Sequence, residues 1–402
     1  MSTSSTISAA RSRGMRDWLP ADMRAFRRVV DSFRQVASHW GYEEIRTPTI
    51  ETYSLFTAAR GLTPQMLSRV YSFLDWDGWS GERVVLRPDS TIPVARAAAD
   101  AGLPLPARLY YVQNVFRFSE TDDREDWQCG IEYLGAPPTV GDLEVVVVAC
   151  ETIESLGLEP RVRLGHAGIA RAVATSALAA SNGDLAAIID RVQAEGLAAL
   201  KPDVAGDAAV TAFLEVALRR STDVALLGNL KAIAAASLPG ALAAIEAVEA
   251  VAAPLAGSGR PILIDLGMPR DFAYYTGVVF EFEADGLSWG KGGRYTPGGD
   301  GVAGTACGAG LDLELLAGRI RPQTHARNPV TIVPEGAGDM AKAMSVARAL
   351  HRSGVAASLG AELAADSLNV RVMGDRLVAH TPQGEQAMAS LDDLVGLLVQ
   401  HK

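Results

Sequence analysis

Polar side chains that could bind a small polar molecule recur in three well-separated segments of this chain. The candidates are Asp89, Thr91, Arg117, Gln128, Glu132, Arg270, Tyr274 and Tyr275. A guanidinium presents a planar fork of donors that matches a carboxylate, whereas carboxylates, amides and hydroxyls accept hydrogen bonds from an ammonium group. Taken singly, each residue has a plainer interpretation, because an arginine usually lies at the surface and a strand tyrosine in the core. Only their combination points to a binding site.

Helices and extended segments that could position these side chains alternate along the first part of the chain. Apolar residues at three- and four-residue steps predict a helix with one buried face, formed by Met23, Phe26, Val30, Phe33 and Ala37. Gly41 ends this helix, and residues 42–50 are expected to be extended, since Pro48 disfavours helical geometry in the residue before it. A second amphipathic helix is predicted over residues 143–156.

The character of the sequence changes twice after this point. From about residue 168 to 256 the chain is rich in Ala and Leu and poor in aromatic residues, which is typical of a helical bundle inserted into a sheet domain. Alternating residues at 278–283, after the apolar run 262–266, predict a half-buried antiparallel strand. The glycine-rich stretch 298–310 is expected to lead into a helix near Leu311.

After Arg321 a polar, proline-containing link leads to a small terminal unit, residues 326–402. Its predicted elements are strands at 330–333, 368–372 and 377–380 and helices at 340–351 and 391–400. This order of strands and helices predicts an α/β module.

The composition is that of a globular protein with one large and one smaller domain. Of the 402 residues, 48% are hydrophobic and 21% are charged, which is enough to bury a large core. The net charge of −10 argues against tight nonspecific binding to nucleic acid, which requires Lys and Arg to displace the counterions of phosphates.

The cysteines and the N-terminal residues indicate in which compartment the protein is expected. Cys129, Cys150 and Cys307 show neither a CxxC pair nor metal-ligand spacing, so we expect no disulfide framework, no metal site and a cytoplasmic location. Residues 1–13 contain no continuous apolar stretch and are expected to form a flexible N-terminus rather than a secretory signal. No segment is expected to be long and apolar enough to span a bilayer.

Four segments resemble, in family order, the catalytic domain of the class II histidyl-tRNA synthetases. They are GMRDWLP with GYEEIRTPTIE, LRPDSTIPVAR, VFRFSETDDREDWQCGIEYLG, and RDFAYYTGVVFEFE with GKGGRY. Four ordered motifs at compatible spacing are far more specific than any single motif. The resemblance implies an α+β fold, in which residues 14–321 form a class II synthetase-like antiparallel sheet flanked by helices, with a helical insertion at about 168–256. Residues 326–402 then resemble a shortened anticodon-binding domain.

The resemblance also implies that this site binds histidine. Arg270 matches the position that contacts the carboxylate of histidine, and Asp89, Thr91 and Gln128 match positions that hold its ammonium group. Asp89 stands where the synthetases usually have glutamate, which sets the carboxylate one methylene further back and allows a water-bridged contact.

Other family positions imply how the imidazole is bound and how the chain associates. Glu132 and Tyr275, next to Tyr274, match the imidazole-binding positions. The GGRY sequence at 292–295 is expected to form a turn in which the backbone approaches a ligand closely. Pro48 and its strand match the motif that builds the dimer interface of the family, which implies a homodimer.

The segment expected to bind the triphosphate of ATP departs from the family pattern. Synthetases place two arginines on ATP, of which the first is retained as Arg117, whereas Leu315 occupies the second position in ACGAGLDLELLAG. Leucine offers neither charge nor donor, and Asp312 adds negative charge nearby. The loop 118–127 is also acidic. Because phosphate chemistry depends on electrostatic stabilisation of its transition state, activation of the amino acid is expected to fail.

A histidine pocket without activation is similar to the regulatory subunits of ATP phosphoribosyltransferase, a branch of the same family. The resemblance implies a chain with no catalytic residue and no cofactor, assembled with the short-form catalytic subunit, which makes phosphoribosyl-ATP in the first step of histidine biosynthesis. Histidine is the expected effector, acting through linkage between its binding and the activity of the complex.

Transfer RNA is not an expected partner, because residues 326–402 carry seven Lys or Arg and eight Asp or Glu. The present role of that module, as a remnant or as a surface for a protein partner, is left open. Two alternative functions remain at this stage: an active histidyl-tRNA synthetase, and a free-standing histidine-binding or ligase paralogue.

Overall fold

In the computed structural model the chain divides into two units, Met1–Pro322 and Gln323–Lys402. The structure describes residues 11–400 except for 59–63, 77–80, 121–122, 182–183, 185–186, 189–190, 193–194, 269–273, 285, 298–303, 321–328, 365–367 and 382–383. Most of the predicted N-terminal segment 1–13 therefore lies outside the described residues, as does Arg270.

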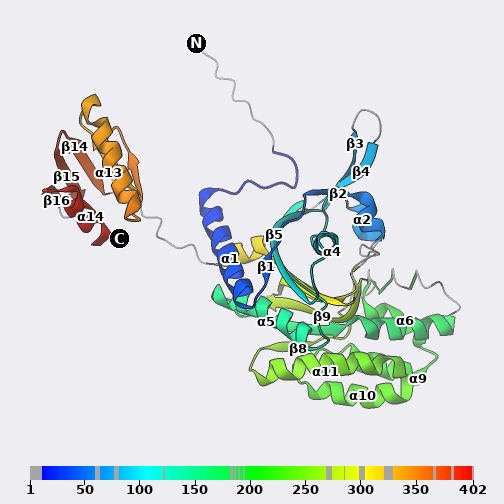
Figure 1. The fold of residues 1–402 in the computed structure, drawn as a ribbon. Coiled ribbons are helices and arrows are strands. Elements are labelled where there is room, and N and C mark those ends of the chain that lie inside the picture. The colour runs from blue at the N-terminus through cyan, green and yellow to red at the C-terminus, as the bar shows by residue number, and fades with distance from the viewer. Residues whose placement is uncertain are drawn as a thin grey trace, which may run out of the picture. The chain divides into compact units, whose positions relative to one another are not determined.

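An eight-stranded sheet with the order β1-β5-β6-β11-β10-β9-β7-β8 forms the centre of the first unit (Figure 1). Its strands are β1 (Glu43–Glu44), β5 (Ala107–Phe116), β6 (Glu125–Leu134), β7 (Arg161–His166), β8 (Ile262–Ile264), β9 (Tyr275–Ala284), β10 (Leu287–Tyr295) and β11 (Ala306–Asp312). The β1–β5 and β7–β8 pairs are parallel and the remaining pairs are antiparallel. This predominantly antiparallel sheet, flanked by helices, agrees with the expected α+β class.

Strand β6 shows how the sheet separates core from site. Successive side chains of a strand point to opposite faces. Cys129, Ile131 and Tyr133 therefore point to one face, where they join the main hydrophobic core. Gln128 and Glu132 point to the other face, where they line a cavity.

Three helices cover the core face of the sheet: α1 (Pro20–His39), α5 (Val140–Ser155) and α12 (Leu313–Arg319). The predicted periodicity of α1 is confirmed in part, since Phe26, Val30, Phe33 and Ala37 are buried together with Val29. Met23 packs at the edge of the same core.

A second, three-stranded sheet and short helices stand beside the first part of the large sheet. They comprise β2 (Ile50–Thr52), α2 (Tyr53–Ala58), α3 (Pro64–Ser68), β3 (Ser72–Trp76), β4 (Gly81–Leu86) and α4 (Thr91–Asp100). The expectation that Pro48 lies on a strand is wrong, because it falls in the link between β1 and β2. Its carbonyl oxygen instead accepts a hydrogen bond from the Arg87 guanidinium.

The Ala- and Leu-rich region forms the expected helices, of which α9, α10 and α11 lie together below β8 in Figure 1. They are α6 (Ala167–Ser181), η1 (Leu197–Leu200), α8 (Lys201–Val204), α9 (Ala208–Ala217), α10 (Ala225–Ser237), η2 (Pro239–Ala241) and α11 (Leu242–Gly257). Helix α10 contacts α9 and α11, and α11 contacts β7 and β9.

One segment of this bundle corrects an expectation from the sequence. Among the described residues, Pro239–Gly257 is long and apolar enough to cross a membrane by length and composition. One face of α11 joins the main core through Ile245, Val248, Val251 and Leu255. A core helix passes the same test of length and composition, because both environments select apolar residues.

The glycine-rich segments agree with one expectation and contradict another. Residues 306–312 form β11 and lead into α12, which begins at Leu313, two residues after the expected position. Residues 292–295 lie within β10 rather than in a turn. Strand pairing on both sides of each segment supplies the stability that local sequence lacks.

The second unit contains a five-stranded sheet of order β13-β12-β14-β15-β16. Its elements are β12 (Val330–Pro334), η3 (Ala337–Asp339), α13 (Met340–Arg352), β13 (Ala357–Leu359), β14 (Asn369–Met373), β15 (Arg376–Thr381), β16 (Gly384–Met388) and α14 (Leu391–Gln400). The five predicted elements are confirmed, and β13 and β16 are additional strands at the two edges. Val346, Leu350, Val370 and Leu394 belong to the unit's own core.

Candidate functional site

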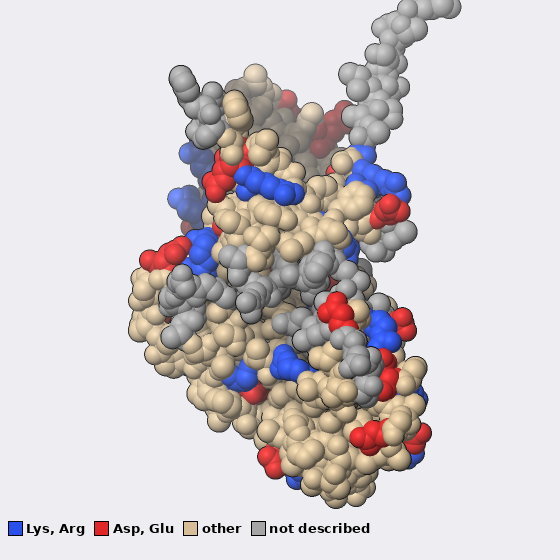
Figure 2. Space-filling model, turned by 90° about the vertical axis from the view of Figure 1, so that its right-hand side faces the viewer, with Lys and Arg blue, Asp and Glu red and all other residues tan. Residues whose placement is uncertain are grey.

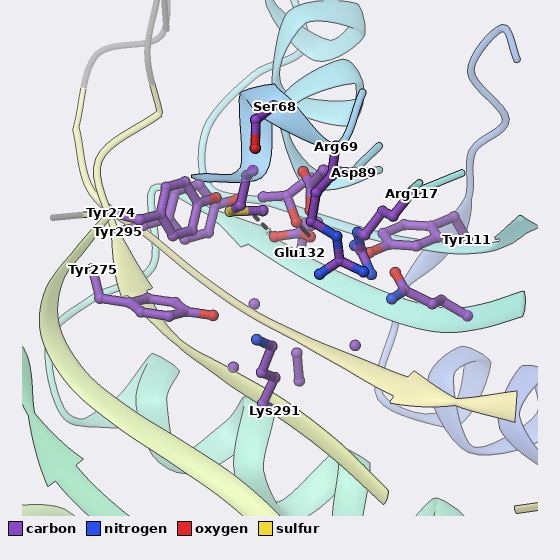
Figure 3. A pocket seen from close by; sticks show the side chains of 17 residues that line it. Ser68, Arg69, Asp89, Tyr111, Arg117, Glu132, Tyr274, Tyr275, Lys291 and Tyr295 are labelled. Atoms are coloured by element: carbon purple, nitrogen blue, oxygen red, sulfur yellow. Dashed lines mark hydrogen bonds between the residues drawn. The ribbon is translucent and has the colours of Figure 1, made fainter. Parts of the chain in front are cut away.

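A cavity of about 550 Å³ opens on the face of the large sheet that is turned away from α1 and α5. Its floor is formed by β6, β10 and β11, and α3, α4 and β5 contribute further side chains (Figure 3). Seven of the eight predicted site residues line it: Asp89, Thr91, Arg117, Gln128, Glu132, Tyr274 and Tyr275. The eighth, Arg270, lies outside the described residues. The cavity therefore gathers predicted residues that are up to 186 positions apart in the chain, from Asp89 to Tyr275.

Glu132 is the most deeply buried charged side chain of the cavity, at 1% exposure. Its two carboxyl oxygens accept hydrogen bonds from the Thr91 hydroxyl at 2.7 Å and the Tyr295 hydroxyl at 2.6 Å (Figure 3, dashed lines). Burial raises the pKa of Glu132 to about 8, although both hydrogen bonds act in the opposite direction. At neutral pH this carboxyl is therefore mostly protonated in the ligand-free chain.

The Glu132 carboxyl packs directly against the backbone of Gly308, which limits where it can lie. A Cβ atom on Gly308 of β11 would lie 2.1 Å from a carboxyl oxygen of Glu132, which pairs with Gly308 across the two strands. Only glycine leaves this space free.

Asp89 occupies the connection between β4 and α4. One of its carboxyl oxygens accepts a hydrogen bond from the Ile92 amide at 3.2 Å, and it lies at the start of the helix. Burial raises the pKa of Asp89, while the nearby positive charges of Arg117 and Lys291 lower it.

Two arginines hold this connection against β5. The buried Arg87 guanidinium donates to the carbonyl oxygens of Thr47, at 2.9 Å, and Asn114, at 2.7 Å. The Nε of Arg117 donates to the carbonyl oxygen of Pro88 at 2.8 Å. The backbone before Asp89 is thus fixed from both sides, which fixes where its carboxylate can reach.

Three tyrosines form one wall of the cavity. The rings of Tyr274 and Tyr295 stack with centroids 5.4 Å apart, and Tyr275 meets Tyr274 edge-on at 5.0 Å. The buried hydroxyl of Tyr274 finds no hydrogen-bond partner among the described residues. A buried hydroxyl without a partner is costly, and a bound polar ligand would relieve that cost.

Positive charge in the cavity comes from Arg69, Arg117 and Lys291. Figure 3 shows Lys291 on the opposite side of the space from Ser68 and Arg69. Together with Asp89 and Glu132, these cations give the cavity both an acceptor side and a cationic side. Such an arrangement suits a ligand that carries an ammonium and an anionic group at once.

Carboxylates gather beyond Arg117, at the end of the site where α12 begins. The Asp126 carboxylate lies 3.7 Å from the Arg117 guanidinium, and the Asp312 carboxylate accepts a hydrogen bond from the Leu315 amide at 2.8 Å. Burial raises the pKa of Glu314 to about 7, and the charges of Asp312 and Asp126 add to the shift. The side chain of Leu315 packs against the main core. Three carboxyl groups are therefore close together at this end of the site, where Arg16 pairs with Glu314 and Arg117 pairs with Asp126.

Sequence reasoning missed Tyr111, Lys291 and Arg69 as lining residues and placed Tyr295 in a turn. No local pattern marks the first three, because Tyr111 and Lys291 reach the cavity through the register of β5 and β10 with their neighbouring strands, and Arg69 reaches it from the residue that follows α3. Arg294, next to Tyr295, is structural: it forms a buried ion pair with Asp142 at 2.9 Å.

Comparison with known proteins places the fold and the family. The histidyl-tRNA synthetase family model matches residues 14–316. An ATP phosphoribosyltransferase regulatory subunit from Dehalococcoides mccartyi is 40% identical over 298 residues, which cover 71% of this chain and 70% of that protein. A histidine–tRNA ligase from Archaeoglobus fulgidus is 30% identical over 282 residues, covering 69% of this chain and 66% of that enzyme.

Solved structures agree with this assignment. The crystal structure of an ATP phosphoribosyltransferase regulatory subunit/histidyl-tRNA synthetase from Bacillus halodurans has a TM-score of 0.72 at 25% identity, covering 88% of this chain and 92% of that chain. A histidyl-tRNA synthetase from Nostoc sp. PCC 7120 shares the fold at a TM-score of 0.74 and 20% identity, covering 98% of this chain and 100% of that chain. The class II synthetase-like α+β fold expected from the sequence is confirmed. The chain belongs to the histidyl-tRNA synthetase family and, within it, to the regulatory subunits of ATP phosphoribosyltransferase.

Proposed function

We propose that this chain has no catalytic activity of its own, assembles with the short-form ATP phosphoribosyltransferase catalytic subunit in the cytoplasm, and reports histidine to it from the cavity. The observation that carries this proposal is the division of the site. The cavity presents buried acceptors and cations suited to an amino acid, whereas the carboxyl groups of Asp126, Asp312 and Glu314 gather next to it, beyond Arg117.

Histidine offers three groups to such a cavity. Its ammonium group would lie near Asp89, Thr91 and Gln128, since Thr91 donates its hydrogen to Glu132 and keeps oxygen lone pairs for an incoming donor. Its imidazole would meet Glu132 and the Tyr274–Tyr275 pair. An N–H of the ring could donate to Glu132, and the unpartnered Tyr274 hydroxyl is placed to serve the other nitrogen. Its carboxylate would be held by a cation, for which the sequence offers Arg270.

Loss of amino-acid activation follows from the acidic end of the site. A triphosphate bound beyond Arg117 would meet the carboxylates of Asp126, Asp312 and Glu314, and Leu315 contributes no donor. Repulsion between the carboxylates and the phosphates would oppose the binding of ATP. Phosphate transfer chemistry also depends on cations next to the phosphates.

Feedback would arise through linkage between the two subunits. If histidine binds the inhibited assembly more tightly than the active one, its binding shifts the population toward inhibition. Typical coupling of this kind changes affinity about 5- to 150-fold.

The test combines assembly, activity and binding. Phosphoribosyl-ATP formation by the catalytic subunit is measured with and without this chain, over a histidine titration, and calorimetry follows histidine binding to the lone chain and to the complex. We expect activity to require the chain and histidine to inhibit it. Glu132→Gln should raise the histidine concentration needed for inhibition, whereas Glu215→Gln, on the exposed side of α9, should not. Unchanged inhibition of an assembled Glu132→Gln complex would move the effector site out of this cavity.

An active histidyl-tRNA synthetase is the second candidate, because relatives at 30% identity are histidine–tRNA ligases. Histidine-dependent exchange between ATP and pyrophosphate by the purified chain would establish it and end the regulatory proposal. On the face in Figure 2, basic and acidic side chains are interspersed, and its described residues form no continuous basic stripe of the kind that a nucleic acid requires. Because Leu315 offers no donor to a triphosphate, we expect no exchange, and the net charge of −10 leads us to expect no binding of tRNA.

Self-association is a further part of the proposal. Pro48, before β2, and Ile50, the first residue of β2, are exposed in the segment that matches the dimer motif of the family. Sedimentation of the chain alone should give a dimer, and Ile50→Lys should shift it toward monomer. A wild-type monomer at all concentrations would refute this part alone.

A further inference from the structure

The middle of the cavity floor is a glycine with a lysine beside it on the next strand. Gly310 of β11 pairs with Gly130 of β6 on one side and with Lys291 of β10 on the other. Directly opposed residues of antiparallel strands project their side chains on the same face. Lys291 therefore rises on the cavity face, directly next to the position where Gly310 has no side chain.

The space above Gly310 is open, unlike the space above the neighbouring glycines. A Cβ atom added to Gly130 would lie 2.3 Å from the Tyr111 hydroxyl oxygen, and one on Gly308 would lie 2.1 Å from Glu132. A Cβ atom on Gly310 would meet only the side-chain oxygen of Gln128, at 3.9 Å. The chain fills the first two spaces with its own side chains and leaves the third to the cavity.

The cationic end of Lys291 is directed into this cavity. Figure 3 shows its ammonium group extending from β10 toward the space in front of Tyr275. Its charge acts on Asp89 across the cavity, where it favours the ionised carboxylate. A lysine carries its charge on a flexible four-carbon stem, and β10 is held by paired strands on both sides, so the base of that stem is fixed.

We propose that Lys291 binds the carboxylate of the amino-acid ligand, whose backbone lies over Gly310 between Lys291 and Gln128. This assignment rests on the proposed histidine-binding function and adds a residue to it. An amino acid that places its ammonium group near Asp89 and Gln128 has its carboxylate one carbon away. Lys291 is the cation on the floor that is next to that point.

The test compares histidine with histidinol, which keeps the ammonium and the imidazole but replaces the carboxylate with a neutral hydroxymethyl group. Calorimetry is done on the full chain as wild type, Lys291→Met and Lys291→Arg. Because a charge-assisted hydrogen bond to the carboxylate is available only to histidine, wild type should bind histidine roughly 10- to 100-fold more tightly than histidinol. Lys291→Met should lose most of that preference while its affinity for histidinol stays the same. Lys291→Arg should retain part of the preference.

A second variant tests the open space without touching the charge. Gly310→Ala adds one methyl group to a strand position with room for it in the ligand-free chain, so folding and melting temperature should be preserved. Binding of histidine and histidinol should both weaken, because each ligand backbone would occupy that space. Gly228→Ala, on the exposed side of α10 with nothing within 4 Å, is the matched control and should leave both affinities unchanged.

The outcomes separate this inference from the proposed function. If wild type binds histidine and Lys291→Met keeps the full preference over histidinol, Lys291 does not hold the carboxylate. Equal losses for the two ligands in Lys291→Met would also overturn the assignment. Failure of the wild type to bind histidine, alone or in the complex, would overturn the proposed function and this inference together.

Discussion

Replacing the buried carboxyl of Glu132 by an amide should change how the stability of the first unit depends on pH. The side chain is 1% exposed and its pKa is raised to about 8, mainly by burial. In the unfolded chain the same carboxyl returns to its ordinary pKa of 4.5. Glu132→Gln keeps the size and polarity of the side chain but cannot ionise.

The direction and the magnitude of this pH effect on stability follow from the difference in proton binding between the folded and the unfolded chain. Below pH 4.5 Glu132 is protonated in both states, so its contribution to stability is fully present. Between pH 4.5 and about 8 the unfolded chain releases a proton that the folded chain retains, and this contribution is lost as the pH rises through that window. At about 1.4 kcal/mol for each tenfold change in acidity, the full cost approaches about 5 kcal/mol. Roughly 4 kcal/mol of it falls between pH 5 and pH 9.

Urea unfolding at pH 5 and pH 9, followed by tryptophan fluorescence, measures this effect. All six tryptophans precede residue 322, so fluorescence reports the first unit alone. The stability of Glu132→Gln relative to wild type should rise by roughly 4 kcal/mol from pH 5 to pH 9. Other titrating groups are common to both proteins and cancel in the difference. Glu215→Gln, at an exposed position of α9, should change stability by less than about 0.5 kcal/mol at either pH. Parallel pH profiles for wild type and Glu132→Gln would refute the burial argument.

Three further substitutions test contacts around the cavity. Arg294→Met should destabilise the first unit by about 3–5 kcal/mol in the same urea assay, because it leaves the buried Asp142 carboxylate without its partner. A loss below about 1 kcal/mol would contradict that account. Gly308→Ala should lower both the melting temperature and histidine affinity, since its methyl group must displace the Glu132 carboxyl; unchanged binding would show that this carboxyl does not contact the ligand. Tyr274→Phe should stabilise the ligand-free chain by about 1 kcal/mol, because it removes a buried hydroxyl without a described partner, and should weaken histidine binding in calorimetry. Loss of stability would mean that the hydroxyl is satisfied in solution.

The amphipathic helix over residues 20–39 and the Ala- and Leu-rich helices could be predicted because helical periodicity is local. The strands of the second unit at 330–334, 369–373 and 376–381 were also predicted, since each is a short apolar run bounded by polar or turn residues. The order of the motifs was sufficient to indicate the family.

Strand pairing accounts for the predictions that failed. GGRY and the segment 306–312 look like loops because glycine disfavours isolated strands, yet both are central strands of the large sheet. Because glycine has no side chain, the Glu132 carboxyl fits above Gly308, and an open space remains above Gly310. The edge strands β13 and β16 escaped prediction because each gains its stability from one neighbouring strand.

The sequence alone determined which polar groups form the site and that Leu315 replaces a phosphate-binding arginine. Both are properties of single positions in ordered motifs. Tertiary structure decided that Lys291, Tyr111 and Tyr295 share the cavity, that the Glu132 carboxyl is buried enough to remain protonated, and that Gly310 is open. Register between distant strands and removal of a side chain from water are collective properties of the fold, and no window of sequence contains them.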